Sequence, residues 1–246
     1  TASTMKIGEV YGGGNEADII GDTYVEIGTG TYHDAAGNLV AITPARNAAM
    51  ITGDVFGGGK GIADSFLCDK AMVGVTDQGF GSTHVTIENG TVNGSVYGGG
   101  QIGRVEHDTW VTIGKEGDET NSPVVKGDVF GAGKGLKTHG YSALVRGKAT
   151  VTVQGKAHVE GSVYGGGEIA SVGKYKVKKA KGDPADAPDW VPVGMPYSLY
   201  DETSESGNCN VVVRDNAIIG PETPMQMKKT GGPDGTGHVF GAGKGR

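Results

Sequence analysis

The sequence predicts an all-β protein built as a parallel β-solenoid (β-helix) with loop insertions. Glycine supplies 47 of the 246 residues, well above the usual share of about 7%. So much glycine disfavours helices, because each interior glycine destabilises a helix by about 1 kcal/mol. In addition, two short motifs alternate along the chain, and both have the period of two that is typical of strands.

The first motif reads Gly-x-Val-(Tyr/Phe)-Gly-(Gly/Ala)-Gly and occurs six times. Its aromatic residue alternates strictly between Tyr and Phe. The Tyr copies continue into Asn, Gln or Glu, whereas each Phe copy continues into Lys-Gly. The six aromatic residues are Tyr11, Phe56, Tyr97, Phe130, Tyr164 and Phe240.

The second motif is a run of five residues in which β-branched side chains recur at alternate positions. It occupies residues 23–27, 83–87, 109–113, 149–153 and 209–213. Such runs predict half-buried strands. Cys209 stands where the other copies have Thr or Ala, which predicts a packing role, and Cys68 and Cys209 cannot by themselves form a disulfide framework.

The two motifs recur together about five times, and the shortest complete unit has about 26 residues. This length suits one coil of a solenoid, in which each coil buries its faces against its neighbours. Residues 1–246 therefore form a single repeat region, with a major insertion at 174–207. We expect the insertions to project from alternate coils on a common side. The chain ends inside its own repeat, which predicts that it is a segment of a longer protein.

A stacked β-hairpin repeat is the alternative architecture. Asn89-Gly90 separates two strand-like runs, and Asn-Gly is the strongest two-residue hairpin signal. Solenoid corners also favour Asn and Gly, so this dipeptide does not decide between the two folds.

Composition and charge exclude several classes of function. The net charge of −6 argues against a nucleic-acid partner, which a basic face would recognise. No apolar run is long enough to insert into a membrane. The Gly-rich runs before Lys60, Lys134 and Lys244 lack the Ser or Thr of a phosphate-binding loop, and we interpret their glycines as structural.

No cofactor and no catalytic residue are expected. Asp54 and Asp128 share a motif position, but other copies have Glu, Ser or His there. This variation leaves only incidental calcium binding at an insertion. The histidines have no zinc-like spacing. A polysaccharide lyase or hydrolase needs a carboxylate with a fixed partner across a groove, and no such pair recurs, so an enzyme is the less favoured class.

The aromatic row has two interpretations. Strict alternation would turn the valines inward and leave an exposed ladder of rings that could bind sugars or proteins. Alternatively, a bulge at the glycine run turns the rings inward, where stacking adds about 0.5–1.5 kcal/mol per pair. We favour the structural role, because six exposed rings would promote aggregation.

The major insertion is the candidate contact segment, because recognition residues concentrate on insertions of a regular scaffold. Its basic run is interpreted as a solvated hairpin arm, and aromatic residues follow. The candidate contact residues are Lys174, Lys176, Lys178, Lys179, Lys181, Trp190, Tyr197 and Tyr200.

The Val-Tyr-Gly-Gly-Gly and Val-Phe-Gly-(Gly/Ala)-Gly-Lys-Gly units resemble those of large glycine-rich, adhesin-like surface proteins of gut anaerobic bacteria. More loosely, they are similar to the passenger regions of bacterial β-helical adhesins. The resemblance implies an extracellular or cell-surface location and a stalk or adhesive role. We therefore expect a scaffold that presents loops to a host or bacterial surface glycan or protein, with end-to-end self-association into filaments. The alternative is a polysaccharide-binding or polysaccharide-degrading β-helix module, or a phage receptor-binding spike.

Overall fold

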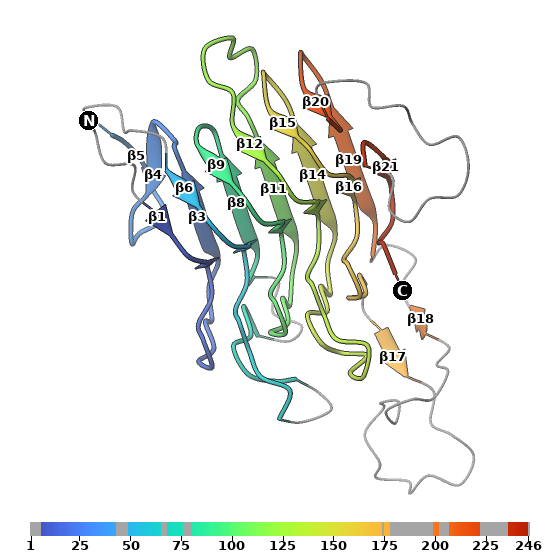
Figure 1. Cartoon of the computed structure of the whole chain (residues 1–246). Coiled ribbons are helices and arrows are strands. Elements are labelled where there is room, and N and C mark those ends of the chain that lie inside the picture. Colours follow the sequence, from blue (N-terminus) through green and yellow to red (C-terminus); the bar gives the residue numbers. More distant parts are fainter. Residues whose placement is uncertain are drawn as a thin grey trace, which may run out of the picture.

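The chain is a parallel β-solenoid, as the repeats predict. The computed structural model describes residues 6–42, 49–64, 68–75, 80–173, 207–221 and 236–245, together with the backbone of 175–177 and 199–201. All of the strands in the solenoid wall pair in parallel with the equivalent strands of adjacent coils, and they form three sheets (Figure 1). Among the described residues no helix is long and apolar enough to cross a bilayer.

Two sheets consist of strands of two residues. Sheet A contains β1 (Lys6–Ile7), β6 (Met50–Ile51), β9 (Thr91–Val92), β12 (Val124–Val125), β15 (His158–Val159) and β20 (Ile218–Ile219). Sheet B contains the six copies of the first motif: β2 (Val10–Tyr11), β7 (Val55–Phe56), β10 (Val96–Tyr97), β13 (Val129–Phe130), β16 (Val163–Tyr164) and β21 (Val239–Phe240). We number the coils one to six by these sheet B strands.

The second motif forms the third and longest sheet, sheet C. Its strands are β3 (Thr23–Ile27), β8 (Thr83–Ile87), β11 (Thr109–Ile113), β14 (Ala149–Val153) and β19 (Cys209–Val213). Between sheet B and sheet C, each of the first five coils contributes one residue to a ladder of single parallel bridges. This ladder consists of Ile19, Val73, Val105, Val145 and Val172.

The hairpin alternative is wrong at Asn89-Gly90. β8 before this dipeptide belongs to sheet C, and β9 after it belongs to sheet A, so the chain turns a corner between two sheets. Gly90 has φ of +105° at this corner, a conformation that glycine adopts without strain. Antiparallel pairs are instead found in insertions, at β4 (Thr31–His33) with β5 (Leu39–Ala41) and at β17 (Tyr175–Val177) with β18 (Leu199–Asp201).

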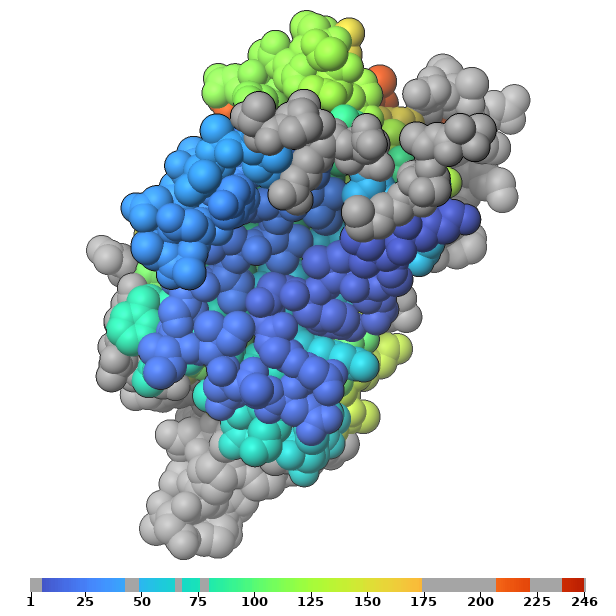
Figure 2. All heavy atoms as spheres, turned by 90° about the vertical axis from the view of Figure 1, so that its left-hand side faces the viewer, coloured from blue at the N-terminus to red at the C-terminus, as the bar shows by residue number. Residues whose placement is uncertain are grey.

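The expectation that insertions share one side is also wrong. The β4–β5 hairpin leaves the coil between sheet C and sheet A, whereas β17–β18 leaves it between the bridge ladder and sheet C. Figure 1 shows β17–β18 below the sheets and the loop between β11 and β12 above them. In Figure 2 the first coil and the β4–β5 hairpin, both blue, cover much of the N-terminal end.

The core follows the period of two in each strand. Val and Ile side chains from sheets A, B and C form one continuous cluster, which includes Ile51, Val55 and Val85. A second, smaller cluster lies near the bridge ladder and includes Val105, Ala132 and Ala149. Cys209 packs against this second cluster, at the position of Ala149 in the coil before.

Inward-facing threonines add hydrogen bonds between successive coils. Thr23, Thr83 and Thr109 donate from Oγ1 to the carbonyl oxygens of Gly57, Gly98 and Gly131, each in the next coil, and the Thr109 bond is 2.6 Å long. The small glycine leaves this carbonyl within reach of a side chain from sheet C. The second motif therefore begins with Thr where that bond forms.

Thr109→Val is expected to lower the free energy of unfolding by about 1–3 kcal/mol, because it leaves the buried carbonyl of Gly131 without this donor. The matched control is Thr112→Val on the outer face of the same strand, which should change stability by less than about 0.5 kcal/mol. Urea unfolding followed by circular dichroism measures both variants. Equal effects of the two substitutions would contradict the role assigned to the inward hydroxyl.

Candidate functional site

The predicted aromatic row forms one continuous stack along sheet B. Adjacent rings have centroids 4.8–5.1 Å apart and planes within 10° of parallel. The stack is a cluster separate from the valine core, because successive side chains of a strand point to opposite faces. Even so, Phe56, Tyr97, Phe130 and Tyr164 are buried.

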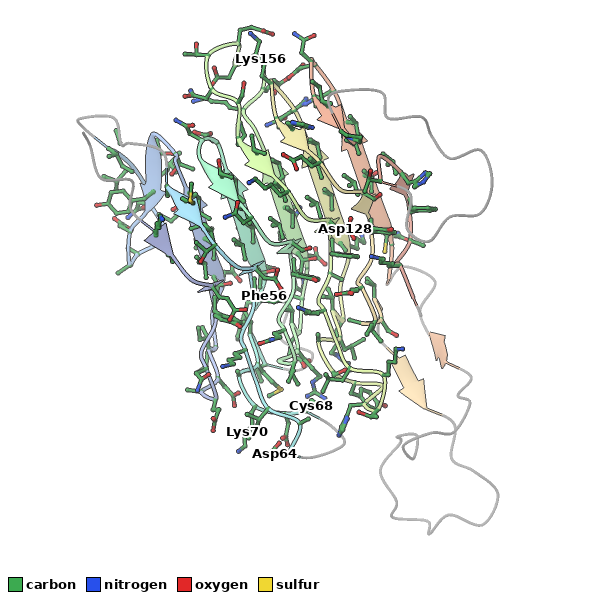
Figure 3. All side chains as sticks on the ribbon, in the orientation of Figure 1. Phe56, Asp64, Cys68, Lys70, Asp128 and Lys156 are labelled. Carbon is green, nitrogen blue, oxygen red and sulfur yellow. The ribbon has the colours of Figure 1, made fainter. Side chains whose placement is uncertain are left out.

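Polar side chains from coils one and two positions further along the chain flank this stack. Lys134 of coil four lies over the rings of Phe56 and Tyr97, and its Nζ is 2.8 Å from the Asp54 carboxylate of coil two. Lys244 of coil six has the same relation to Tyr164 and to Asp128 of coil four. Figure 3 shows Phe56 and Asp128 in the middle of the stack of coils, well away from Lys156 at one corner.

The coils that contain Tyr are linked by a different pair of side chains, which also joins coils that are two apart. The Tyr11 hydroxyl lies 2.9 Å from Gln101 Oε1 and 3.0 Å from Glu9 Oε2 as acceptors, and the Tyr97 hydroxyl donates to Glu168 at 2.8 Å. Burial raises the pKa of Tyr97, and the hydrogen bond to Glu168 raises it further. The Tyr of one coil therefore pairs with a Gln or Glu two coils later. In the coils that contain Phe, the Asp before the Phe pairs with a Lys two coils later. These two pairings account for the strict alternation of Tyr and Phe along the stack.

The carboxylates that suggested calcium thus have lysine partners. Asp54 Oδ2 accepts from Lys134, while Asp54 Oδ1 accepts from the backbone N–H of Ser95. Within the described residues, no three His, Cys, Asp or Glu side chains gather in a way that could hold a metal ion.

The candidate contact residues of the major insertion lie mostly outside the described residues. Lys176 and Tyr200 are opposite each other in the antiparallel pair of β17 and β18. The insertion therefore begins and ends as a hairpin. Of the other candidate residues, Lys174, Lys178, Lys179, Lys181, Trp190 and Tyr197, the structure gives no description.

Cys68 and Cys209 lie three coils apart and are not joined by a disulfide. Cys68 is buried, and Figure 3 places it near Asp64 and Lys70 at the lower edge of the solenoid. Burial raises the pKa of the Cys68 thiol to about 11 and also raises the pKa of Cys209. Because the thiolate is the reactive form, neither cysteine is suited to nucleophilic chemistry.

A buried ion cluster lies beside the bridge ladder. The carboxylate of Glu106 has no exposed side-chain surface and lies between two guanidinium groups, 3.4 Å from Arg104 Nε and 3.1 Å from Arg146 Nε. This cluster joins coils three and four. Because its carboxylate is enclosed by protein, its role is structural.

A second row of rings, which the sequence analysis did not single out, lies on the outer face of sheet C. The strand register aligns Tyr24, His84 and Trp110 in successive coils. Their ring centroids are 4.7 Å apart and their planes are within 9° of parallel. His33 from the β4–β5 hairpin stacks on the other face of Tyr24, at 4.1 Å. This row is partly exposed, unlike the stack on sheet B.

Beside the ring row runs a row of hydroxyl groups. Thr86, Thr112 and Thr152 are aligned in coils two to four, and Glu26 occupies the same position in coil one. The three hydroxyls form no hydrogen bond with another residue that the structure describes, whereas the inward threonines of the same sheet all do. The outer face of sheet C therefore offers free donors and acceptors beside aromatic rings.

This face is close to neutral. Glu26 is its one acidic residue, and both carboxylate oxygens are engaged by His33, through Nδ1 at 2.9 Å and the backbone N–H at 2.8 Å. Burial lowers the pKa of His84, because desolvation disfavours the imidazolium form. From coil two onward the outward positions of sheet C are therefore His, Trp, Thr, Asn and Val, without a fixed charge.

The sequence contains a local signal for this face of sheet C. The residues between the inward positions of the second motif are Tyr24, His84 and Trp110 in three successive copies. Their stacking depends on the coil register, which aligns the copies without a shift. We define the outer face of sheet C, with its ring row and hydroxyl row, as the candidate site.

Comparisons with protein-family models, with curated proteins and with solved structures give no match.

Proposed function

We propose that the chain is a structural and adhesive protein of the bacterial cell surface. In this proposal the solenoid is a stiff stalk that presents contact surfaces to a glycan, a host protein or another cell. The observation that carries the proposal is the unbroken register of the coils. Sheets A and B run through six coils and sheet C through five without a slip.

Three kinds of contact make the coils resist bending and separation. Parallel backbone hydrogen bonds join each coil to the next, the sheet B rings stack along the whole length, and Lys–Asp pairs link coils that are two apart. Coupling beyond the nearest neighbour is suited to a rod that bears load, because opening one interface also breaks contacts that span it.

Two surfaces are available for contact in this proposal: the major insertion and the outer face of sheet C. The two ends of the insertion lie close together, since a Cβ on Gly207 would be 3.2 Å from the Cα of Gly173. A deletion of residues 174–206 can therefore be closed without breaking the coil, and it should leave the melting temperature nearly unchanged.

Adhesion is tested with fluorescent beads that carry the purified full chain, and beads that carry serum albumin serve as the control. The targets are a mucin-coated surface and a layer of bacterial cells. Retention of the full-chain beads under flow supports the proposal, and retention no greater than that of the albumin beads overturns its adhesive part. Light scattering on the same material reads out end-to-end self-association.

The catalytic alternative is tested on the same preparation. The chain is incubated with pectin, alginate and xylan, and absorbance in the ultraviolet and reducing ends are followed. New unsaturated or reducing ends would overturn the assignment as a non-enzymatic scaffold. Unchanged polymers, together with bead retention, support that assignment.

A further inference from the structure

The ring row on sheet C stops abruptly at Trp110. One face of its indole stacks on His84, 4.7 Å away. At the other face, the next position in the register is Thr150, followed by Asn210. A large flat side chain is thus followed by two small polar ones in the register, which we call the step above Thr150.

The surroundings of this step are polar but uncharged. Thr150 and Thr152 present outward hydroxyls from β14, Thr112 presents one from β11, and Asn210 presents an amide from β19. Hydroxyl groups donate and accept hydrogen bonds, and a side-chain amide also does both. Trp110 is partly exposed, and His84 is its one ring partner among the described residues, so the step combines an aromatic face that no other ring covers with groups that match neutral hydroxyls.

We propose that this step binds a sugar residue of a neutral glycan, with the sugar ring above Thr150 and against the indole of Trp110. A pyranose has a face of C–H groups, whose partial positive charge complements the negative face of an aromatic ring. Its rim carries hydroxyls that can reach Thr112, Thr152 and Asn210. The sugar ring would extend the ring row by one position, at the place where the protein itself has only the small side chain of Thr150.

The rest of the face favours a chain of sugars over a single one. The hydroxyl row repeats at each coil, through Thr86, Thr112 and Thr152, in strict register. A glycan that lies along the solenoid axis would meet the same donor at each coil. The absence of fixed charge among the outward residues from coil two onward favours a neutral polymer over an acidic one. This inference rests on the proposed function and gives it a ligand class.

The chain has two tryptophans, so a Trp190→Phe background makes Trp110 the single indole reporter. This protein is titrated with cellohexaose, chitohexaose and mannohexaose, and hexagalacturonate is the acidic control. Saturable quenching or a shift of the emission with a neutral oligosaccharide is expected. Saturation only with hexagalacturonate, or no change with any of the four, would overturn the proposal.

Thr150→Tyr is the decisive variant, because it fills the step with a ring supplied by the protein. Tyr is a good strand former and would stack on Trp110, so the melting temperature should be retained or raised while saturable quenching of Trp110 by the sugar is lost. Thr150→Val is the matched control: it keeps the shape of the side chain, leaves the indole face open and should still bind, more weakly. Unaltered binding by Thr150→Tyr, at a retained melting temperature, would contradict the assignment.

The bead experiment separates this inference from the proposed function. Retention that survives Thr150→Tyr but is lost on deletion of 174–206 overturns the glycan site and supports adhesion through the insertion. Retention that is lost with Thr150→Tyr and survives the deletion supports the glycan site. If the chain binds oligosaccharide in solution but its beads are not retained, the result supports the glycan site and overturns the adhesive function.

Discussion

Gly98→Ala is expected to destabilise the protein by about 3 kcal/mol or more, at or above the upper end of the usual cost of overpacking. A Cβ at this position would collide with the carbonyl oxygen of Gly131 in the next coil and would lie 3.1 Å from a methyl group of Val111. Neither obstacle can move freely, since the Gly131 carbonyl also accepts the Thr109 hydroxyl and Val111 belongs to the core.

Gly21→Ala is the matched control for this prediction. A Cβ on Gly21 would have no heavy atom within 4 Å, and the residue has no positive φ. The substitution should therefore be neutral or stabilise by up to about 1 kcal/mol through the unfolded state. Thermal and urea unfolding of both variants provide the comparison. A Gly98→Ala protein as stable as the parent would show that the coils tolerate wider separation than their register implies.

Phe130→Ala is expected to lower the free energy of unfolding by about 3–5 kcal/mol, the usual range for truncation of a buried Phe. Phe130 lies in the middle of the sheet B stack, with its ring centroid 4.9 Å from those of both Tyr97 and Tyr164. Its removal leaves a gap between two rings, and the coils cannot close it without disrupting the neighbouring sheets.

Phe240→Ala is the control, because this ring stacks on Tyr164 from one side and is 45% exposed. Truncation of Phe240 should therefore lower the free energy of unfolding much less than truncation of Phe130. A differential scanning calorimeter measures both changes in melting temperature. Equal shifts, or no shift at Phe130, would mean that the stack contributes little to stability.

Much of the fold follows from local patterns. The five-residue runs form the strands of sheet C, and the six Val-aromatic pairs form the strands of sheet B, because β-branched residues at period two fit a half-buried sheet. Glycine after the aromatic residue is required in coils one to five by the close approach of the next coil, as at Gly98. The corner at Gly90 is ambiguous in the sequence, because the same dipeptide serves a hairpin and a solenoid corner.

The candidate site could be predicted only in part. Strict alternation predicts that Tyr11, Phe56 and their equivalents are exposed rings. In the structure, the four rings in the middle of the stack are buried. Alternation alone places a side chain on one face of a sheet, whereas burial depends on what covers that face. Here the cover includes Lys134, which lies two coils beyond Phe56 and one coil beyond Tyr97.

Local sequence patterns are enough to specify the coil: its strands, its glycine positions and the coupling of Tyr to Gln or Glu and of Phe to Lys. They do not specify which ring row is enclosed and which faces the solvent, and the assembled coils settle that. Hydrogen-bond partners of the sheet B tyrosines are distant in the sequence, since Gln101 is 90 residues from Tyr11 and Glu168 is 71 residues from Tyr97, and the coil register brings them together. On sheet C the same register aligns Tyr24, His84 and Trp110 and then ends the row at Thr150, which creates the step proposed to bind a sugar.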